Sequence, residues 1–375
     1  MKITNNKILK SKTFKRTTFI RKNVHLKMLS ILVLICLVTG MCSGCGTTEN
    51  TPRETAGDEE KKIQIGMSFD SFVIERWQRD RDVFVSMAKE LGAEVNVQNA
   101  NGDIEEQKKQ IDYFIKKGMD VIVIICIDSD GLKDYVQKAK DEGIKIIAYD
   151  RQIYNANVDL YISFDNKAVG TMMGEALIDK GLAGGNVLML GGSPTDSNVP
   201  MVEEGFRKVM EKNDVTILDS IHAEGWKAEV AGTYIYDNMD IVSQADAIMC
   251  GNDNIASQVV HALSEKRIAG NMLVVGQDAD LEACQRIVEG TQVMTVYKPV
   301  ERLAKRAAEA AVSLAKGEKI TGEGVTTIND GSYLVPYIGL EPIKVTEENM
   351  DAVIIGSGFH LKEDVYLNVP YKMPE

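Results

Sequence analysis

The chain has 375 residues, and two lobes are expected because single hydrophobic cores stop growing below this length. Hydrophobic residues make up 44% and charged residues 26% of the sequence, as in ordinary soluble globular proteins. The formal net charge of −12 argues against general nucleic-acid binding, which requires a basic surface, but it is compatible with a small neutral ligand.

The first segment differs in composition from the rest. Residues 1–27 carry nine Lys or Arg and no acid, an apolar run follows over residues 29–38, and small residues lead to Cys45. This order is typical of a secretory signal peptide, and the apolar run is short for a membrane span. The tripeptide ending at Cys45 resembles the lipobox of bacterial lipoproteins, whose cysteine is lipidated, and Cys42 is the alternative. We predict a signal peptide over residues 1–45 with lipidation at Cys45.

Polar residues without apolar periodicity follow the signal peptide and predict a flexible tether over residues 46–61. Beyond it, Cys126, Cys250 and Cys284 fall in apolar strand patterns or on a helix pattern. We interpret these cysteines as small buried hydrophobic residues, and no disulfide framework is evident.

From residue 62 onward, strand patterns alternate with helix patterns. Runs rich in Val and Ile predict strands covered on both faces, and apolar residues three or four apart predict helices. The first succession has strands at 63–69, 94–98, 121–126, 145–149 and 160–164, with helices at 74–91, 104–117 and 131–142.

The alternation then begins again. The second succession has strands at 186–191, 215–221, 247–250, 273–276 and 293–297, with helices at 168–180, 199–212, 227–239, 255–266, 280–288 and 300–316. Two such successions predict an α/β protein with two doubly wound, Rossmann-like lobes and a ligand cleft between them. Neither a Gly-x-Gly-x-x-Gly turn after the first strand nor a phosphate loop is present, so nucleotide binding has no support.

Asp150 and Arg151 directly follow the strand predicted at 145–149. In open α/β sheets, ligands bind beyond the carboxyl ends of the strands. A carboxylate only accepts hydrogen bonds and a guanidinium only donates them, so this pair suits a hydroxyl group, which does both. An ion pair that closes the strand end is the alternative interpretation.

Similar polar clusters follow several other predicted strands in both halves of the chain. For each Asp or Asn, a turn or helix-capping role is the alternative, and for Trp77 and Trp226 a core position. Capping does not explain why Arg76 and Lys298 accompany so many carboxylates and amides. Aromatic rings stack on the apolar faces of a pyranose, and planar polar side chains bind its hydroxyls, so the clusters together indicate a sugar site.

Several motifs carry a family resemblance from about residue 62 to about residue 317. They include Glu75-Arg76-Trp77-Gln78, Ala148-Tyr149-Asp150-Arg151, Gly276-Gln277-Asp278-Ala279-Asp280 and Met294-Thr295-Val296-Tyr297-Lys298-Pro299. In these motifs the chain resembles the type I periplasmic sugar-binding proteins of ABC transporters, in the group for ribose, galactose and xylose. The resemblance implies an N-terminal lobe of residues 62–165 plus 299–330 and a C-terminal lobe of residues 166–298 plus 331–375. Crossovers are expected near 164–166, near 297–299 and within 328–340.

The resemblance also implies a ligand, D-xylose, and a set of residues that contact it, with neither cofactor nor metal. The implied contacts are Arg76, Trp77, Asp150, Arg151, Asp196, Asn198, Trp226, Asn252, Asp278 and Lys298. The expected protein is extracytoplasmic, anchored to the cell membrane by lipid, and delivers the sugar to the permease of an ABC transporter. The alternative partner is the ectodomain of a membrane sensor histidine kinase.

Two further classes are disfavoured. A glycosidase needs two carboxylates across the scissile bond, for which Asp150 and Asp278 are candidates, but the many Arg and amide groups suit holding a neutral sugar without chemistry. The histidines show no spacing typical of a metal site or a nucleophile–base pair. A transcriptional repressor with a similar core is disfavoured because a signal peptide stands where its DNA-binding headpiece would be.

Overall fold

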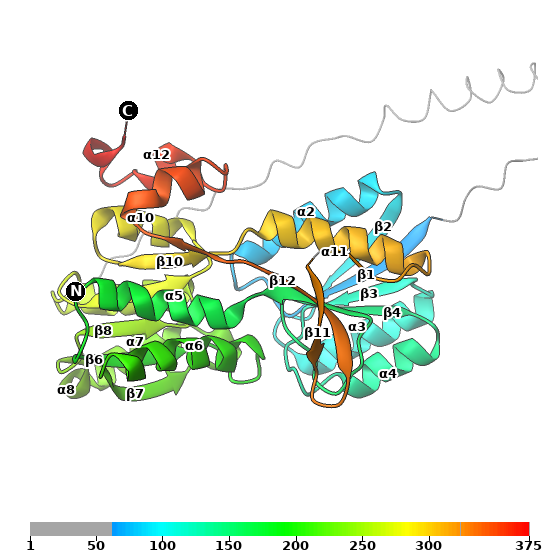
Figure 1. Ribbon diagram of the computed structural model, residues 1–375, viewed down its shortest axis with the longest axis horizontal. Coiled ribbons are helices and arrows are strands. Elements are labelled where there is room, and N and C mark those ends of the chain that lie inside the picture. Colours follow the sequence, from blue (N-terminus) through cyan, green and yellow to red (C-terminus); the bar gives the residue numbers. More distant parts are fainter. Residues whose placement is uncertain (1–61, 323, 375) are drawn as a thin grey trace, which may run out of the picture. The chain divides into compact units, whose positions relative to one another are not determined.

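The structure, a computed structural model, describes residues 62–322 and 324–374. The predicted signal peptide, the tether and Cys45 lie outside the described residues. In the described part, two lobes each contain a sheet of mainly parallel strands covered by helices (Figure 1).

The sheet of the first lobe has the strand order β11-β12-β5-β4-β3-β1-β2, and β11 is the antiparallel strand. Its strands are β1 (Ile63–Phe69), β2 (Ala93–Asn99), β3 (Val121–Ile124), β4 (Lys145–Tyr149), β5 (Leu160–Phe164), β11 (Val325–Asn329) and β12 (Leu334–Leu340). Its helices are α2 (Arg76–Glu90), α3 (Ile104–Lys117), α4 (Lys133–Asp141) and α11 (Val300–Ala315).

Alternate residues of these strands face different helix layers, because successive side chains of a strand point to opposite faces of the sheet. On β3, Val121 and Val123 pack in a cluster with residues of α2 and α11, whereas Ile122 and Ile124 pack with α3 and α4. Burial on both faces explains why β3 reads as a continuous apolar run in the sequence.

The sheet of the second lobe has the strand order β13-β10-β9-β8-β6-β7, with β13 antiparallel. Its strands are β6 (Asn186–Gly191), β7 (Thr216–His222), β8 (Ala247–Cys250), β9 (Leu273–Gln277), β10 (Met294–Tyr297) and β13 (Ile343–Val345). Its helices are α5 (Asn166–Asp179), α6 (Asn198–Lys212), the short 3₁₀ helix η1 (Glu224–Trp226), α7 (Glu229–Asp237), α8 (Met239–Val242), α9 (Asp253–Glu265) and α10 (Leu281–Glu289). The backbones of α5 and α6 approach closely at two glycines, and a β-carbon on Gly170 would lie 1.8 Å from the Val202 carbonyl oxygen.

The chain passes between the sheets after β5, after β10 and after β12. The first crossover leads directly into α5, where the Asp165 side chain accepts a hydrogen bond from the Ala168 N–H at 2.9 Å. An N-cap of this kind stabilises a helix start by about 1 kcal/mol. The cap therefore helps to fix the point at which the chain leaves one lobe and enters the other.

The predicted lobe boundary at residue 330 is wrong for β12, which belongs to the first sheet. β12 pairs in parallel with β5, with Ile338 opposite Ile162, and Tyr337 stacks on Tyr161 with ring centroids 5.1 Å apart. The crossover follows Leu340 instead of lying within 328–340. The β11–β12 hairpin did not stand out in the sequence because its strands are partly exposed and because Pro336 within β12 argues against a strand inside a sheet.

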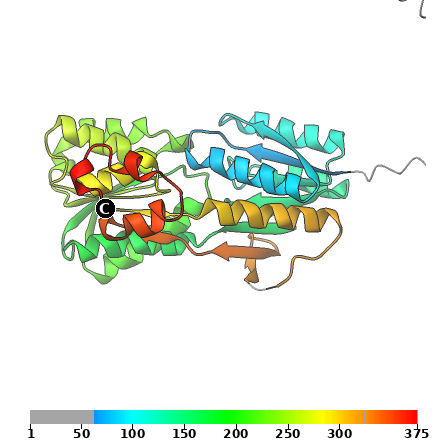
Figure 2. The same cartoon turned by 90° about the horizontal axis from the view of Figure 1, so that it is seen from above.

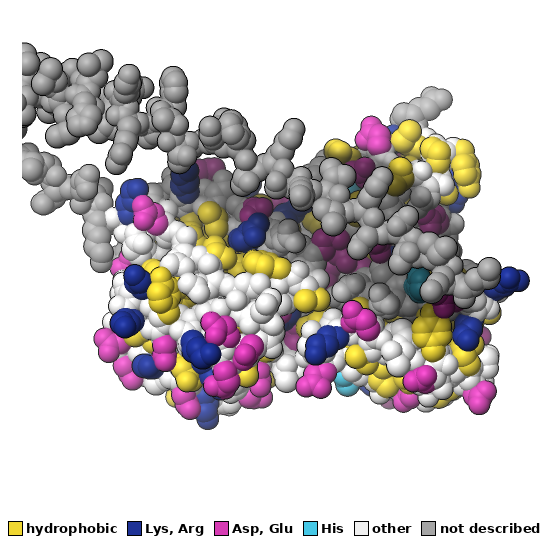
Figure 3. Space-filling view, turned by 180° about the vertical axis from the view of Figure 1, so that it is seen from behind, with side chains coloured by type: hydrophobic (Ala, Val, Ile, Leu, Met, Phe, Trp, Pro, Cys, Tyr) yellow, Lys and Arg dark blue, Asp and Glu magenta, His cyan; other side chains and the backbone are white. Residues whose placement is uncertain are grey.

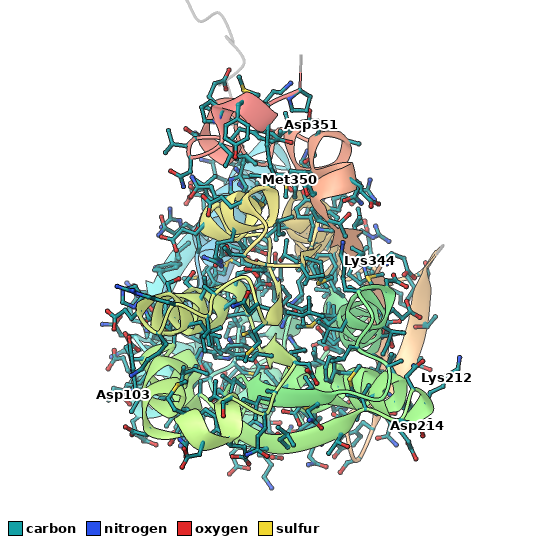
Figure 4. The ribbon with its side chains drawn as sticks, turned by 90° about the vertical axis from the view of Figure 1, so that its left-hand side faces the viewer. Asp103, Lys212, Asp214, Lys344, Met350 and Asp351 are labelled. Atoms are coloured by element: carbon teal, nitrogen blue, oxygen red, sulfur yellow. The ribbon has the colours of Figure 1, made fainter. Side chains whose placement is uncertain are left out.

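A C-terminal segment of short helices, residues 347–372, follows β13. Its elements are η2 (Glu347–Asn349), the π-helix η3 (Asp351–Ile355), α12 (Lys362–Val365) and η4 (Pro370–Lys372). Figure 2 shows this segment lying across the second lobe, and Figure 4 labels Met350 and Asp351 within it. Met350, Ile354 and Tyr366 are buried against α10 and β10, so the segment is an integral part of the second lobe.

Charged side chains of both signs are interspersed on the face of the molecule shown in Figure 3. Exposed ion pairs such as Lys138 with Asp112, at 2.6 Å, are each worth at most about 1 kcal/mol. The buried apolar clusters therefore contribute most of the stability. Among the described residues, no helix has the length and apolar character needed to cross a membrane.

Candidate ligand-binding site

A cavity lined by residues of both lobes lies between them, beyond the carboxyl ends of several strands. The β1–α2 connection, the end of β4, the β6–α6 loop, η1, the end of β9 and the crossover after β10 all contribute to its wall. The lining residues are Ile74, Arg76, Trp77, Asp150, Arg151, Asp196, Asn198, Trp226, Gln277, Asp278 and Lys298. This position agrees with the general rule for ligand sites in open α/β sheets.

Arg76 is fixed in the first turn of α2 by two carboxylates and an aromatic ring. Its Nη2 donates to Asp150 Oδ2 at 2.6 Å, and its Nε donates to Asp80 Oδ2, one helical turn away, at 3.3 Å. The guanidinium carbon lies 4.3 Å from the centre of the Trp77 ring, a distance typical of a cation–π contact. The guanidinium is therefore held in place within the first lobe.

Asp150 connects Arg76 to the second lobe. Its Oδ1 accepts a hydrogen bond from Asn198 Nδ2 at 2.9 Å, in addition to the bond from Arg76. Burial alone would raise the pKa of Asp150, but Arg76, Lys298 and Arg151 together lower it below its usual value. The carboxyl group is therefore ionised at neutral pH. Its backbone is left-handed, with φ 64°, and Ser163 Oγ donates to its carbonyl oxygen at 2.5 Å.

Arg151 is the second connection between the lobes. Its Nη1 donates to Asp70 Oδ2 at 2.8 Å and to the Cys126 carbonyl at 2.9 Å within the first lobe. Its Nε lies 2.5 Å from Asp196 Oδ2 of the second lobe, and Trp226 Nε1 donates to the same oxygen at 3.1 Å. Burial raises the pKa of Asp70 and of Asp196, and the Arg151 charge opposes this rise.

Asp278 lies at the end of β9, opposite the first lobe. Its Oδ1 is 3.4 Å from Lys298 Nζ and 3.8 Å from Arg76 Nη1. Its backbone is left-handed as well, with φ 97°. Residues with a β-carbon adopt this conformation rarely, and Asp and Asn do so more often than most.

Most buried polar side-chain atoms without a hydrogen-bond partner among the described residues belong to this cavity. They are Trp77 Nε1, Arg151 Nη2, Gln277 Oε1 and Asp278 Oδ1, the last of which has only the ion pairs with Lys298 and Arg76. Such atoms are normally satisfied in folded proteins, so a cluster of them indicates a ligand that completes their bonds. The first lobe supplies donors and the second lobe supplies acceptors, which suits a ligand that both accepts and donates.

All the predicted contact residues except Asn252 line the cavity. Asn252 instead caps α9, since its Oδ1 accepts a hydrogen bond from the Ile255 N–H at 2.9 Å. The capping alternative considered for Asp and Asn residues therefore describes Asn252. That the other side chains contact a sugar stays a prediction.

The predicted contact set does not include Gln277 or the supporting carboxylates Asp70 and Asp80. Gln277 Nε2 donates to the Gly251 carbonyl at 2.5 Å, which leaves Oε1 in the cavity wall. Asp70 directly follows β1, and this strand-end position was the available signal. Burial raises the pKa of Asp80 to about 6, although Arg76 and the Tyr149 hydroxyl, which donates to it, lower this value.

Within residues 62–322 and 324–374, no group of three or more His, Cys, Asp or Glu side chains is arranged to hold a metal ion. Cys126, Cys250 and Cys284 are buried free thiols. Burial raises the pKa of Cys126 to about 12, so this thiol is protonated at neutral pH and serves as a packing group.

Comparison with known proteins agrees with this geometry. A model of the periplasmic binding protein domain matches residues 65–319. The chain belongs to the periplasmic binding protein family. The D-xylose-binding periplasmic proteins of Haemophilus influenzae and Escherichia coli are each 41% identical to it, over 312 and 310 residues. These matches cover 82% and 81% of this chain and 93% of each relative.

Solved structures show the same architecture. An ABC transporter solute-binding protein from Clostridium phytofermentans with bound β-D-glucose has a TM-score of 0.72 and 26% identity, covering 80% of this chain and 99% of the other. The predicted two-lobe fold and the predicted family are thus confirmed for this periplasmic binding protein. The sequence predicts a binding protein, and the relatives named above are binding proteins. Family membership also agrees with the predicted extracytoplasmic location.

Proposed function

We propose that this protein binds D-xylose between its lobes and delivers the sugar to the permease of an ABC transporter. The cluster of unpaired donors and acceptors around the cavity carries the proposal. Each hydroxyl of a sugar can accept from Trp77 or Arg151 and donate to Gln277 or Asp278. The two relatives at 41% identity are named for D-xylose, which supports this sugar over other pentoses and hexoses.

The aromatic side chains of the cavity wall favour a sugar ring. The indole rings of Trp77 and Trp226 lie in the wall, where they can cover the apolar faces of the ring.

The charges of the cavity wall favour a neutral ligand over an acidic one. Each cationic side chain of the wall already lies within ion-pair distance of a carboxylate, so little positive charge is left for a phosphate or carboxylate ligand. The pairs are Arg76 with Asp150, Arg151 with Asp196, and Lys298 with Asp278.

Contacts from both lobes also explain how the sugar is reported to a partner. A ligand shifts a conformational equilibrium only by its difference in affinity for the two states. A sugar that bonds to Arg151 of one lobe and Asp278 of the other has all its contacts only when the lobes are closed. The permease then distinguishes the closed, sugar-bound protein from the empty protein by the surface that the closed lobes present.

Calorimetric titration of the purified protein with D-xylose, D-ribose and D-glucose tests the ligand. We expect one D-xylose per chain and weaker binding of the other two sugars. Heat from another sugar without heat from D-xylose would refute the proposed specificity. An absence of heat from every sugar would refute the proposed function.

We further propose that the mature protein is anchored through a lipid on Cys45. Labelling of cells with a fatty-acid analogue, followed by fractionation, tests the anchor. The variant Cys45→Ser is expected to lose the label and to leave the membrane fraction, because the acceptor thiol is gone. Cys42→Ser is the matched control and should keep both. The opposite result would assign lipidation to Cys42.

A further inference from the structure

The turn that carries Asp278 has an unusual backbone. Asp278 and Ala279 both adopt left-handed conformations, with φ 97° and 58°, and neither is glycine. Left-handed backbone is unfavourable for residues with a β-carbon, and two in succession persist only where the surroundings hold them. Since Asp278 Oδ1 lies at the cavity with ion pairs but without a hydrogen-bond partner, the groups that hold this turn also direct Asp278.

The second lobe holds the N–H groups of the turn. The Asp278 N–H donates to the Val296 carbonyl at 2.8 Å, and the Ala279 N–H donates to Thr295 Oγ1 at 3.1 Å. The next N–H, of Asp280, donates to Asp253 Oδ2 at 3.2 Å. These partners hold only the N–H groups of the turn. Within the lobe's own sheet and helices, the Ala279 carbonyl accepts a weak bond from Cys284 Sγ at 3.6 Å.

His360 of the C-terminal segment holds that carbonyl. Its Nε2 lies 2.8 Å from the Ala279 carbonyl oxygen, across 81 residues of sequence. A carbonyl only accepts, so Nε2 carries the proton. Burial lowers the pKa of His360, which keeps the imidazole neutral at pH 7. The residue lies beyond the part of the chain that matches the family domain, residues 65–319.

The His360 ring is itself held in position by its neighbours. It meets the Phe359 ring edge-on, with centroids 4.6 Å apart, and Phe359 packs on Tyr297 at 4.8 Å. Arg79, on α2 of the first lobe, lies 4.3 Å over the Phe359 ring and donates from Nη2 to the Phe359 carbonyl at 2.8 Å. The C-terminal segment is thus clamped where it meets the turn.

We propose that His360 is a positioning residue for the sugar site: it holds the Ala279 carbonyl and thereby keeps Asp278 directed into the cavity. The inference rests on the proposed sugar-binding function. It makes the C-terminal segment part of the binding machinery, although no atom of His360 lines the cavity.

Two amide substitutions of His360 test this role. The Gln amide nitrogen can occupy the place of the imidazole Nε2, whereas the Asn amide is one carbon shorter and does not reach the Ala279 carbonyl. His360→Asn is expected to weaken D-xylose binding about three- to tenfold, the effect of one lost hydrogen bond, while His360→Gln keeps nearly the parent affinity. The matched control, His261→Asn, changes a histidine that is 68% exposed on α9 and should bind like the parent.

Hydrogen exchange of the sugar-free protein gives a second readout that does not depend on the ligand. The amides of Ala279 and Asp280 should exchange faster in His360→Asn than in the parent, and at the parent rate in His360→Gln. If the parent binds no sugar, the proposed function fails, and the exchange rates still decide whether His360 holds the turn.

The inference is overturned if His360→Asn matches the parent in affinity and exchange, or if His360→Gln loses as much as His360→Asn. Should the Asn variant fail to fold, Arg79→Met releases the Phe359 carbonyl and is expected to weaken binding in the same direction. Unchanged sugar binding in Arg79→Met would then overturn the inference about His360. Arg81→Met on the same helix is the control for Arg79→Met. Among the described carboxylates, Arg81 pairs only with that of the adjacent Asp82.

Discussion

Replacing Arg151 with Met is expected to weaken sugar binding at least about 100-fold and to destabilise the protein. The guanidinium is almost fully buried and lies against Asp70 of one lobe and Asp196 of the other. Its removal leaves two buried carboxylates without their cation, which typically costs about 3–5 kcal/mol of folding free energy. Calorimetry measures the binding, and urea unfolding followed by circular dichroism measures the stability.

The pH dependence of Arg151→Met provides a sharper test. Burial already raises the pKa of Asp70 and Asp196 in the presence of Arg151, and without this cation the rise is larger. Carboxyl groups with a raised pKa in the folded state bind more protons there than in the unfolded state, so the free energy of unfolding increases as the pH falls. The stability deficit of the variant should therefore shrink between neutral and mildly acidic pH.

Arg207→Met is the matched control for Arg151→Met. Arg207 is 44% exposed and lies 3.7 Å from Glu203 on the same helix, so its loss should change stability by less than about 1 kcal/mol and leave sugar binding intact. If Arg151→Met were as stable as this control and bound sugar like the parent, the role assigned to Arg151 would be wrong.

Asp278→Asn is expected to weaken sugar binding about 10- to 100-fold with little loss of stability. Asn keeps the shape of the side chain and tolerates a left-handed backbone, so the turn is preserved. The variant loses a charged acceptor for the sugar hydroxyls, and it leaves Lys298 and Arg76 with less negative charge nearby. Titration with D-xylose and a thermal melt separate the two effects.

The control for Asp278→Asn is Asp112→Asn, which removes a carboxylate that is 42% exposed and paired with Lys138. It should bind sugar like the parent. Equal affinity of Asp278→Asn and the parent would show that this carboxylate does not contact the ligand. Gln277 would then be the candidate acceptor of the second lobe.

Much of the architecture followed from local patterns. The strands predicted at 63–69, 145–149, 160–164 and 186–191 have the bounds found in the structure. They were predictable because strands in such sheets leave apolar runs, as in 145–149 and 186–191, or alternating apolar residues, as in 63–69. The β11–β12 hairpin and the C-terminal segment were missed since their residues are partly exposed or form single turns, which leave no such signal.

The candidate site was partly predictable for a related reason. Parallel strands end at one edge of a sheet, so polar residues after strand ends were expected to meet there. That rule does not separate a side chain that faces the cavity from one that caps a helix. Asn252 and Asn198 both follow strands, but Asn252 caps α9 while Asn198 donates to Asp150 across the lobes.

The sequence by itself determined the two α/β lobes, the family and most of the side chains around the cavity. It did so because apolar periodicity and strand-end motifs are local properties of the chain. Only the tertiary structure decided which charges pair: Asp150 and Arg151 are neighbours in sequence, but Asp150 bonds to Arg76 and Asn198, and Arg151 to Asp70 and Asp196. It also brought His360 to the turn of Asp278. Such partners depend on how distant strands and helices pack, and no local pattern encodes them.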